Sequence, residues 1–209
     1  MRKIKRFKIS TRQKEITRKV MRLGLDLSAD GLIDEIALTR FVLDLSKKLD
    51  PGTVYELNEN VLWDLPEHTI AAQGMFSACV VTLGTACTDY ANTLQGHTQL
   101  AAQTVLFEFL RTATLFVLDL VKEQAEKEEY EAPEPQFVYV PKLGLAPVPK
   151  LFQDSPRAEQ ETAAKILPEL LKRVSSDKID VALDGELITP PATVVFIVPW
   201  QKKRRKGKK

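Results

Sequence analysis

The spacing of apolar residues in the first fifty positions predicts two helices. Apolar side chains recur at intervals of three and four, which places them on one face of a helix. Ser10-Thr11-Arg12-Gln13 has the form of a capping box, so we expect the first helix to begin there and Gly24 to end it. The second helix spans about 30–49 and ends at Asp50-Pro51-Gly52. The apolar positions of the two helices are Ile16, Val20, Leu23, Leu32, Ile33, Ile36, Leu38, Phe41, Val42 and Leu45.

Two strands and a short helix are predicted next. Thr53–Leu57 is β-branched and aromatic, which favours a strand, and the polar residues and proline of 58–68 indicate a loop. Met75–Leu83 has the composition of a buried strand, and Gly84 ends it. We expect Thr85–Leu94 to be a short helix.

A long helix is predicted over about 99–128, with Thr98 as its cap and Gln95-Gly96 as the stop before it. Its apolar residues surround most of the helix, which is typical of a helix at the centre of a core. These residues are Leu100, Val105, Leu106, Phe109, Leu110, Ala113, Phe116, Val117, Leu120 and Val121.

The last third of the chain is predicted to be extended at first and then helical and stranded. Ala132–Pro149 holds five prolines, which exclude a regular helix, so we expect a crossing segment. A helix capped by Asp154 or Ser155 is expected to run to Arg173, with a bend at Pro168. The expected strands are Phe137–Val140, Ile179–Leu183, Glu186–Thr189 and Val194–Val198, the middle two joined in a hairpin by Asp184-Gly185.

These elements predict the α+β class, with a few mostly antiparallel strands packed on a long central helix and helices at the N-terminus. We expect one domain over residues 1–200, in which 1–50 is the N-terminal helical part and 132–149 the proline-rich crossing segment. Residues 201–209 carry seven Lys or Arg and no acid. A block of like charge repels itself, so we expect a disordered basic tail.

Charge is divided unevenly along the chain. The formal net charge of +2 combines +9 over residues 1–23, +7 over 201–209 and −14 over the remaining 177 residues. Basic ends can contact phosphates, so residues 2–8 and 202–209 are a candidate nucleic-acid contact, and a solubilising tail is an equally good interpretation. No apolar run approaches the roughly 20 residues that a membrane span needs, and none follows the basic first residues as in a secretory signal.

Candidate catalytic chemistry is sparse. The spacing of Cys79, Cys87, His68 and His97 matches no zinc pattern, so no metal is expected. Cys87 lies at a predicted helix N-terminus, where a thiol pKa can be lowered, which makes a small thiol enzyme one alternative and a packed cysteine the other. Two cysteines give no disulfide framework and favour a reducing, cytoplasmic location.

Three stretches carry a resemblance to a known family. They are Val80-Val81-Thr82-Leu83-Gly84, then residues 138–147 (Val-Tyr-Val-Pro-Lys-Leu-Gly-Leu-Ala-Pro), then Gln160–Leu171 with Ile179–Leu183 and the strand after Pro190-Pro191. In this order, residues 75–200 resemble the S-adenosylmethionine-binding activation domain of cobalamin-dependent methionine synthase and its small stand-alone relatives. The family's pieces are a strand ending in Thr-x-Gly, an Arg-x-Ser-Pro-Gly-Tyr-Gly-x-x-Pro segment, and a helix and strand that lead to a closing strand.

The resemblance implies a ligand cleft lined by residues 138–147 and bordered by 82–85. The cofactor-site residues that it implies are Val138, Tyr139, Pro141, Lys142, Leu143, Gly144, Thr82, Gly84 and Thr85. In the family, the Arg and the Gly-Tyr of the second stretch contact S-adenosylmethionine, and here these positions hold Val138, Lys142 and Leu143. The guanidinium that would hold a carboxylate is absent, so the resemblance implies the fold and leaves S-adenosylmethionine binding open.

The family's domain holds S-adenosylmethionine over a cobalamin on a partner module and does not itself transfer the methyl group. The resemblance therefore implies an accessory protein, with no catalytic residue of its own, that works with a corrinoid protein or methyltransferase whose cobalamin stays on the partner. The alternative from another class is a nucleic-acid or ribosome-associated protein that uses its basic ends.

Overall fold

The fold is built on one five-stranded antiparallel sheet, seen in a computed structural model that describes residues 1–58, 75–158 and 160–203. The predicted loop at 58–68 falls almost entirely outside these ranges. The strand order is β1-β2-β3-β8-β5. The strands are β1 (Arg2–Lys5), β2 (Gly52–Asn58), β3 (Phe76–Thr82), β8 (Thr193–Pro199) and β5 (Gln136–Tyr139).

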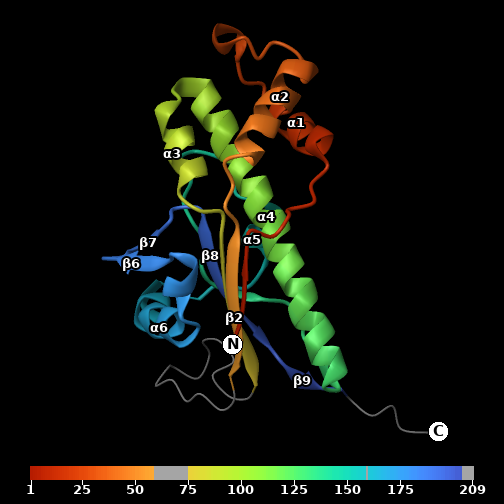
Figure 1. Ribbon diagram of the computed structural model, residues 1–209, viewed down its shortest axis with the longest axis vertical. Helices are drawn as coiled ribbons and strands as arrows, with labels where there is room; N and C mark the ends of the chain where they lie inside the picture. The colour runs from red at the N-terminus through yellow and green to blue at the C-terminus, as the bar shows by residue number, and fades with distance from the viewer. Residues whose placement is uncertain (59–74, 159, 204–209) are drawn as a thin grey trace, which may run out of the picture.

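Helices cover both faces of this sheet, which gives three layers (Figure 1). One face packs on α4 (Gly96–Lys127), a helix of 32 residues, and the other on α6 (Gln160–Arg173). Successive residues of β3 alternate between the two layers: Cys79 and Val81 face the α4 core, whereas Val80 faces the α6 core. A strand buried on both faces needs apolar residues at almost every position, which explains the continuous apolar run in this part of the sequence.

The remaining elements flank these layers. The helices α1 (Gln13–Met21) and α2 (Glu35–Ser46) lie beside the N-terminal half of α4, and α3 (Ala86–Thr93) precedes it (Figure 1). The short elements are a 3-10 turn at Ser28–Asp30, α5 (Lys150–Asp154), a 3-10 turn at Ser176–Ile179, the hairpin of β6 (Ala182–Asp184) and β7 (Leu187–Thr189), and the pair of β4 (Tyr130–Glu131) and β9 (Gln201–Lys202). The predicted α+β class, with an antiparallel sheet on a long helix, is confirmed.

Three strands are absent from the sequence prediction: β1 and the two-residue strands β4 and β9. Arg2–Lys5 pairs with β2 as an edge strand, with Arg2 opposite Tyr55 and Lys5 opposite Gly52. The segment has a single part-buried apolar residue, Ile4, so it shows no alternating pattern that would predict a strand. Its pairing depends on the open edge of β2, fifty residues later in the chain.

Both predicted N-caps in the first half of the chain are wrong. The residue before α1 is Arg12, and no side chain caps that helix, so Ser10 does not form a capping box. The long helix begins at Gly96 and not after Thr98, whose hydroxyl donates to the Asp30 carboxylate instead. The partner of Thr98 and the surroundings of Ser10 come from distant parts of the chain, so the local sequence does not reveal them.

Two boundaries in the C-terminal part also differ from the prediction. Neither Asp154 nor Ser155 caps α6, because residues 156–158 bind the outer edge of β5: the Phe137 N–H donates to the Pro156 carbonyl at 2.8 Å. The predicted strand at 179–183 begins only at Ala182, after a 3-10 turn.

The basic tail is ordered at its beginning. Gln201 and Lys202 pair with Glu131 and Tyr130, two residues beyond the predicted domain limit at 200. The Lys203 N–H also donates to the Glu129 carbonyl at 3.5 Å. The first tail residues therefore lie at the acidic end of α4, and residues 204–209 fall outside the described part of the chain.

Candidate functional site

The cofactor-site residues that the resemblance implies lie at one end of the sheet. β3 and β5 both run towards this end, and β8, which lies between them, begins there. Thr82 pairs with Thr193 and Tyr139 with Val195, so the two outgoing loops are separated by one strand. Two strand spacings correspond to about 10 Å. The tertiary structure thus brings the 82–85 corner and the 138–147 segment to the same edge.

Only part of this set is accessible. Thr82, Val138, Pro141 and Leu143 are buried, and Leu143 belongs to the α4 core. Thr85, Lys142 and Gly144 are exposed, while Tyr139 and Gly84 are partly buried. Leu145, at the turn of the segment, is 91% exposed. The surface available to a ligand or partner here consists of the loop from Lys142 to Leu145 and the corner at Thr85.

The 82–85 corner has a fixed geometry. The Gly84 N–H donates to Thr82 Oγ1 at 3.2 Å, and the Thr82 and Thr193 hydroxyl oxygens lie 2.9 Å apart. Gly84 has a φ of +82°, and a Cβ there would lie 3.1 Å from the Asp50 carbonyl oxygen. Both the left-handed backbone and the close approach of Asp50 require glycine. The Thr82 hydroxyl is therefore used inside the fold and is not free for a ligand.

The 138–147 segment is anchored on α4 by Gly144. This residue has a φ of +55°, and a Cβ would come within 2.3 Å of the Gln103 side chain. Leu143 and Ala146 on either side insert into the core. Because Leu143 and Ala146 are buried and Gly144 lies close to Gln103, Leu145 is held toward solvent.

Tyr139 connects the end of β5 with the β6–β7 hairpin. Burial raises the pKa of its phenol, and a hydrogen bond with the Ile188 backbone opposes that rise. A raised pKa keeps the phenol neutral at physiological pH. The position therefore supports the hairpin and offers no charged group to a ligand.

Cys87 does not have the environment of a reactive thiol. It is fully buried in the α4 core, and its Sγ lies 3.4 Å from the Gly84 carbonyl and 3.6 Å from the Leu83 carbonyl. Burial raises the pKa of Cys87 to about 11, and it also raises the pKa of Cys79. A thiol that remains protonated is a poor nucleophile, so of the two alternatives for Cys87 the structure favours the packed cysteine over the thiol enzyme.

The described residues offer no grouping for a metal ion. Among them, no three His, Cys, Asp or Glu side chains come close enough together to share one. His97 accepts a hydrogen bond from the Asp26 N–H at 3.2 Å through Nδ1, which ties α4 to the loop after α1. His68 lies outside the described residues.

A cavity lies elsewhere, between the segment of residues 6–13 and the C-terminal end of α2. We call residues 6–13 the strap. The cavity measures about 1260 Å³ and is walled by the strap and by Ser46–Pro51, with Ala86 and Phe109 completing its lining. None of the nine cofactor-site residues expected from the sequence lines it. Of the residues that line the cavity, Ala86 lies nearest to these residues in the sequence, because it directly follows Gly84 and Thr85.

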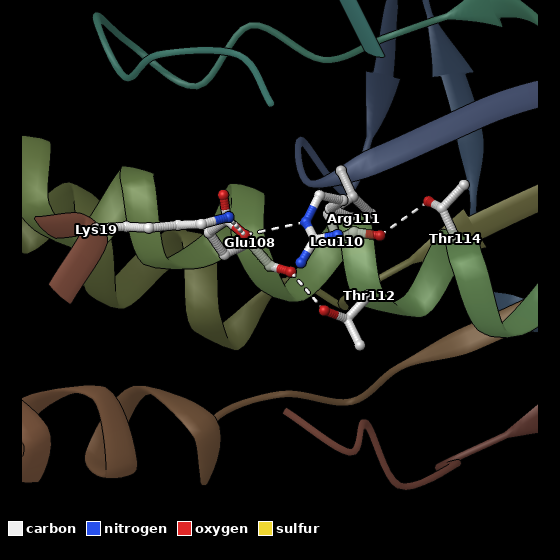
Figure 2. Close-up of polar contacts among 6 residues, drawn as sticks. All are labelled: Lys19, Glu108, Leu110, Arg111, Thr112 and Thr114. Carbon is white, nitrogen blue, oxygen red and sulfur yellow. Dashed lines mark hydrogen bonds and ion pairs between the residues drawn. The ribbon is translucent and has the colours of Figure 1, made fainter. Parts of the chain in front are cut away.

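A second cavity of about 270 Å³ shares Ser10–Arg12 of the strap, and its wall contains a buried carboxylate. Glu108 of α4 is 7% exposed. Its Oε2 accepts from Lys19 Nζ of α1 at 2.6 Å and from Arg111 Nε at 3.0 Å. Figure 2 shows both cations converging on Glu108, and the Thr112 hydroxyl donating to the Glu108 carbonyl at 3.0 Å. Arg111 lies on α4 itself, so the Lys19–Glu108 pair is the ion pair that joins α1 to α4.

Sequence reasoning misses both cavities because their walls come from distant segments. The strap, α2 and α4 are separated by tens of residues, and no local motif marks their meeting. The one local signal is the high density of Lys and Arg in residues 1–23.

Comparison of the sequence with protein-family models and with curated proteins gives no match. Of the helices in the described residues, none has the length and apolar character needed to cross a membrane.

Proposed function

We propose that this chain is an accessory protein of corrinoid-dependent methyl transfer, with no catalytic group of its own, that docks on a cobalamin-carrying partner. The docking surface is the end of the sheet where the Thr85 corner and the Lys142–Leu145 loop lie together. A cytoplasmic location fits this role and the two free, buried cysteines.

The observation that carries the proposal is the placement of two distant motifs at one edge. The strand ending in Thr82-Leu83-Gly84 and the segment 138–147 are the pieces that resemble the methionine synthase activation domain. They lie on either side of the first residues of β8. In open sheets, loops that meet at one end of the strands are a common place for ligands and partners.

The chemistry of this edge favours docking over S-adenosylmethionine binding. The position of the family's arginine is occupied by Val138, which is buried in the α6 core. Lys142 replaces a glycine and is exposed, and Leu143 replaces a tyrosine and is buried. No guanidinium in this segment can hold the carboxylate of S-adenosylmethionine. Leu145, by contrast, presents an apolar side chain to a partner.

Calorimetric titration of the full chain tests the proposal. We expect heat on mixing with a cobalamin-loaded corrinoid protein and a much weaker signal, or none, with S-adenosylmethionine alone. Leu145→Asp should weaken docking about tenfold or more, because it places a charge in the contact. Ile33→Asp is the matched control, since Ile33 is 75% exposed and lies before α2. The absence of heat and of a thermal shift with both probes would overturn the proposal.

A further inference from the structure

The cavity between the strap and α2 is strongly cationic. Five of its lining residues carry a positive charge, Arg6, Lys8, Arg12, Lys47 and Lys48, against a single carboxylate, Asp50. The first three belong to the strap and the other two directly follow α2, so cations line both walls. The second cavity shares Ser10–Arg12 with the first, but its cations Lys19 and Arg111 are paired with Glu108 and it also contains Glu15, so the excess of positive charge belongs to the first cavity.

The charges of the larger cavity are held only weakly by partners within the chain. Arg6 Nε lies 3.3 Å from Asp50, with side chains 84% and 58% exposed. Lys47 pairs with Asp44 at 2.7 Å, and both are exposed. Lys48 Nζ lies 4.5 Å from the centre of the Tyr90 ring. Exposed pairs of this kind are weak, so an anion in the groove can replace them.

Hydroxyl groups add neutral donors to the same walls. Ser10, Thr11 and Ser46 line the larger cavity. Ser10 does not cap α1, and within the described ranges neither it nor Thr11 has a hydrogen-bond partner from its side chain. Arginine, lysine and hydroxyl groups together are the usual contacts of phosphate oxygens.

The shape of the groove restricts the ligand. A flat bilayer does not reach into a concave cavity, and the apolar strap residues Phe7 and Ile9 pack on the core instead of pointing outward. Phe7 stacks on Phe116 with ring centroids 5.0 Å apart, so it does not provide a free platform for a base. The volume exceeds the roughly 300–1,000 Å³ of small-molecule pockets, which favours an extended ligand.

We propose that this groove binds a ligand with several phosphate groups in series, held through its phosphates and not through stacked bases. A single-stranded nucleic acid and a free nucleoside triphosphate share this chemistry. The proposal is independent of the corrinoid partner, since its residues lie outside the Lys142–Leu145 edge. It shares Arg6 and Lys8 with the contact expected through residues 2–8, and it adds Arg12 and Lys47-Lys48, which form a defined groove with them.

Fluorescence anisotropy with the full chain tests this site. The probes are a labelled single-stranded 12-mer, unlabelled ATP as competitor, and polyglutamate of matched charge. We expect the 12-mer to bind with a log K that falls with log salt at about −0.7 per phosphate contact. The triple variant Lys8→Gln, Lys47→Gln, Lys48→Gln should flatten this slope by about 2 and weaken binding roughly a hundredfold at 0.1 M salt. If ATP competes at micromolar concentration, the ligand of the groove is a free nucleotide. If ATP does not compete, the ligand is a single-stranded nucleic acid. Both outcomes support a phosphate site.

The matched control is Lys165→Gln, an exposed cation on α6 that should leave binding unchanged. The three substituted lysines are exposed, and a far-UV spectrum and melting curve of the triple variant establish that it is folded. Two results overturn the proposal: a triple variant that binds the 12-mer as the native chain does, or polyglutamate that competes as well as the 12-mer, which assigns the groove to an acidic protein.

Discussion

Replacing Glu108 by glutamine tests whether the buried carboxylate is what fixes α1 on α4. Glu108→Gln keeps the shape of the side chain and removes its charge. Lys19 and Arg111 then face a neutral amide in place of a carboxylate that accepts from both at 2.6 and 3.0 Å. Apart from this pair, α1 is held by the buried side chains of Ile16, Thr17 and Val20, and the Thr17 hydroxyl lies 3.2 Å from that of Thr39 on α2.

The expected loss follows from the exposure of the partners. A hydrogen bond to a charged group contributes about 1.5–3 kcal/mol when well formed. Lys19 and Arg111 are 42% and 31% exposed, so solvent reduces both contributions, and the glutamine oxygen keeps one neutral acceptor. We therefore expect Glu108→Gln to lower the free energy of unfolding by about 2 kcal/mol, or the melting temperature by about 4–8 °C.

Urea unfolding followed by circular dichroism measures this, with Lys19→Gln and the double variant completing a thermodynamic cycle. The coupling between Lys19 and Glu108 should be about 1 kcal/mol. Glu169→Gln is the matched control, because Glu169 pairs with Arg173 on exposed α6 surface and should cost less than about 0.5 kcal/mol. A coupling below about 0.3 kcal/mol, or equal losses at both glutamates, would refute the reasoning.

Three further outcomes are expected. Gly84→Ala should lower the free energy of unfolding by about 2 kcal/mol or more, and Gly96→Ala by about 1 kcal/mol. Both glycines have a positive φ, but only Gly84 packs against Asp50. Equal losses of the two variants in denaturant titrations would contradict this. Alkylation of the folded chain by iodoacetamide at neutral pH should be slow at both Cys79 and Cys87, as peptide mapping can establish, and fast labelling of Cys87 would restore the thiol-enzyme hypothesis. Burial raises the pKa of Cys87 from 9.0 to about 11, so the thiol of the unfolded chain ionises at lower pH than that of the folded chain. The free energy of unfolding should therefore fall as pH rises from 9 to 11, and Cys87→Ala should remove part of that fall.

The structure places residues 82–85 and 138–147 at one end of the sheet, and which of their side chains are accessible depends on the tertiary packing. The sequence predicts a strand ending at Gly84 and an extended segment around Gly144, and both features are present. Burial of Val138 and Leu143 could not be predicted, since it depends on which face of a two-sided sheet and which side of α4 each residue meets.

Local physical chemistry in the sequence determines the fold class, the central position of α4 and the two-sided burial of β3. These features follow from the apolar periodicity of long segments, in which many residues add to the same pattern. The tertiary structure alone decides that Arg2–Lys5 becomes a strand, that Ser10 lines a cavity instead of capping a helix, and that Glu108 meets Lys19. Each of these depends on one contact between segments some 40 to 90 residues apart. A single distant contact leaves no periodic trace in the sequence, so it is visible only when the chain is folded.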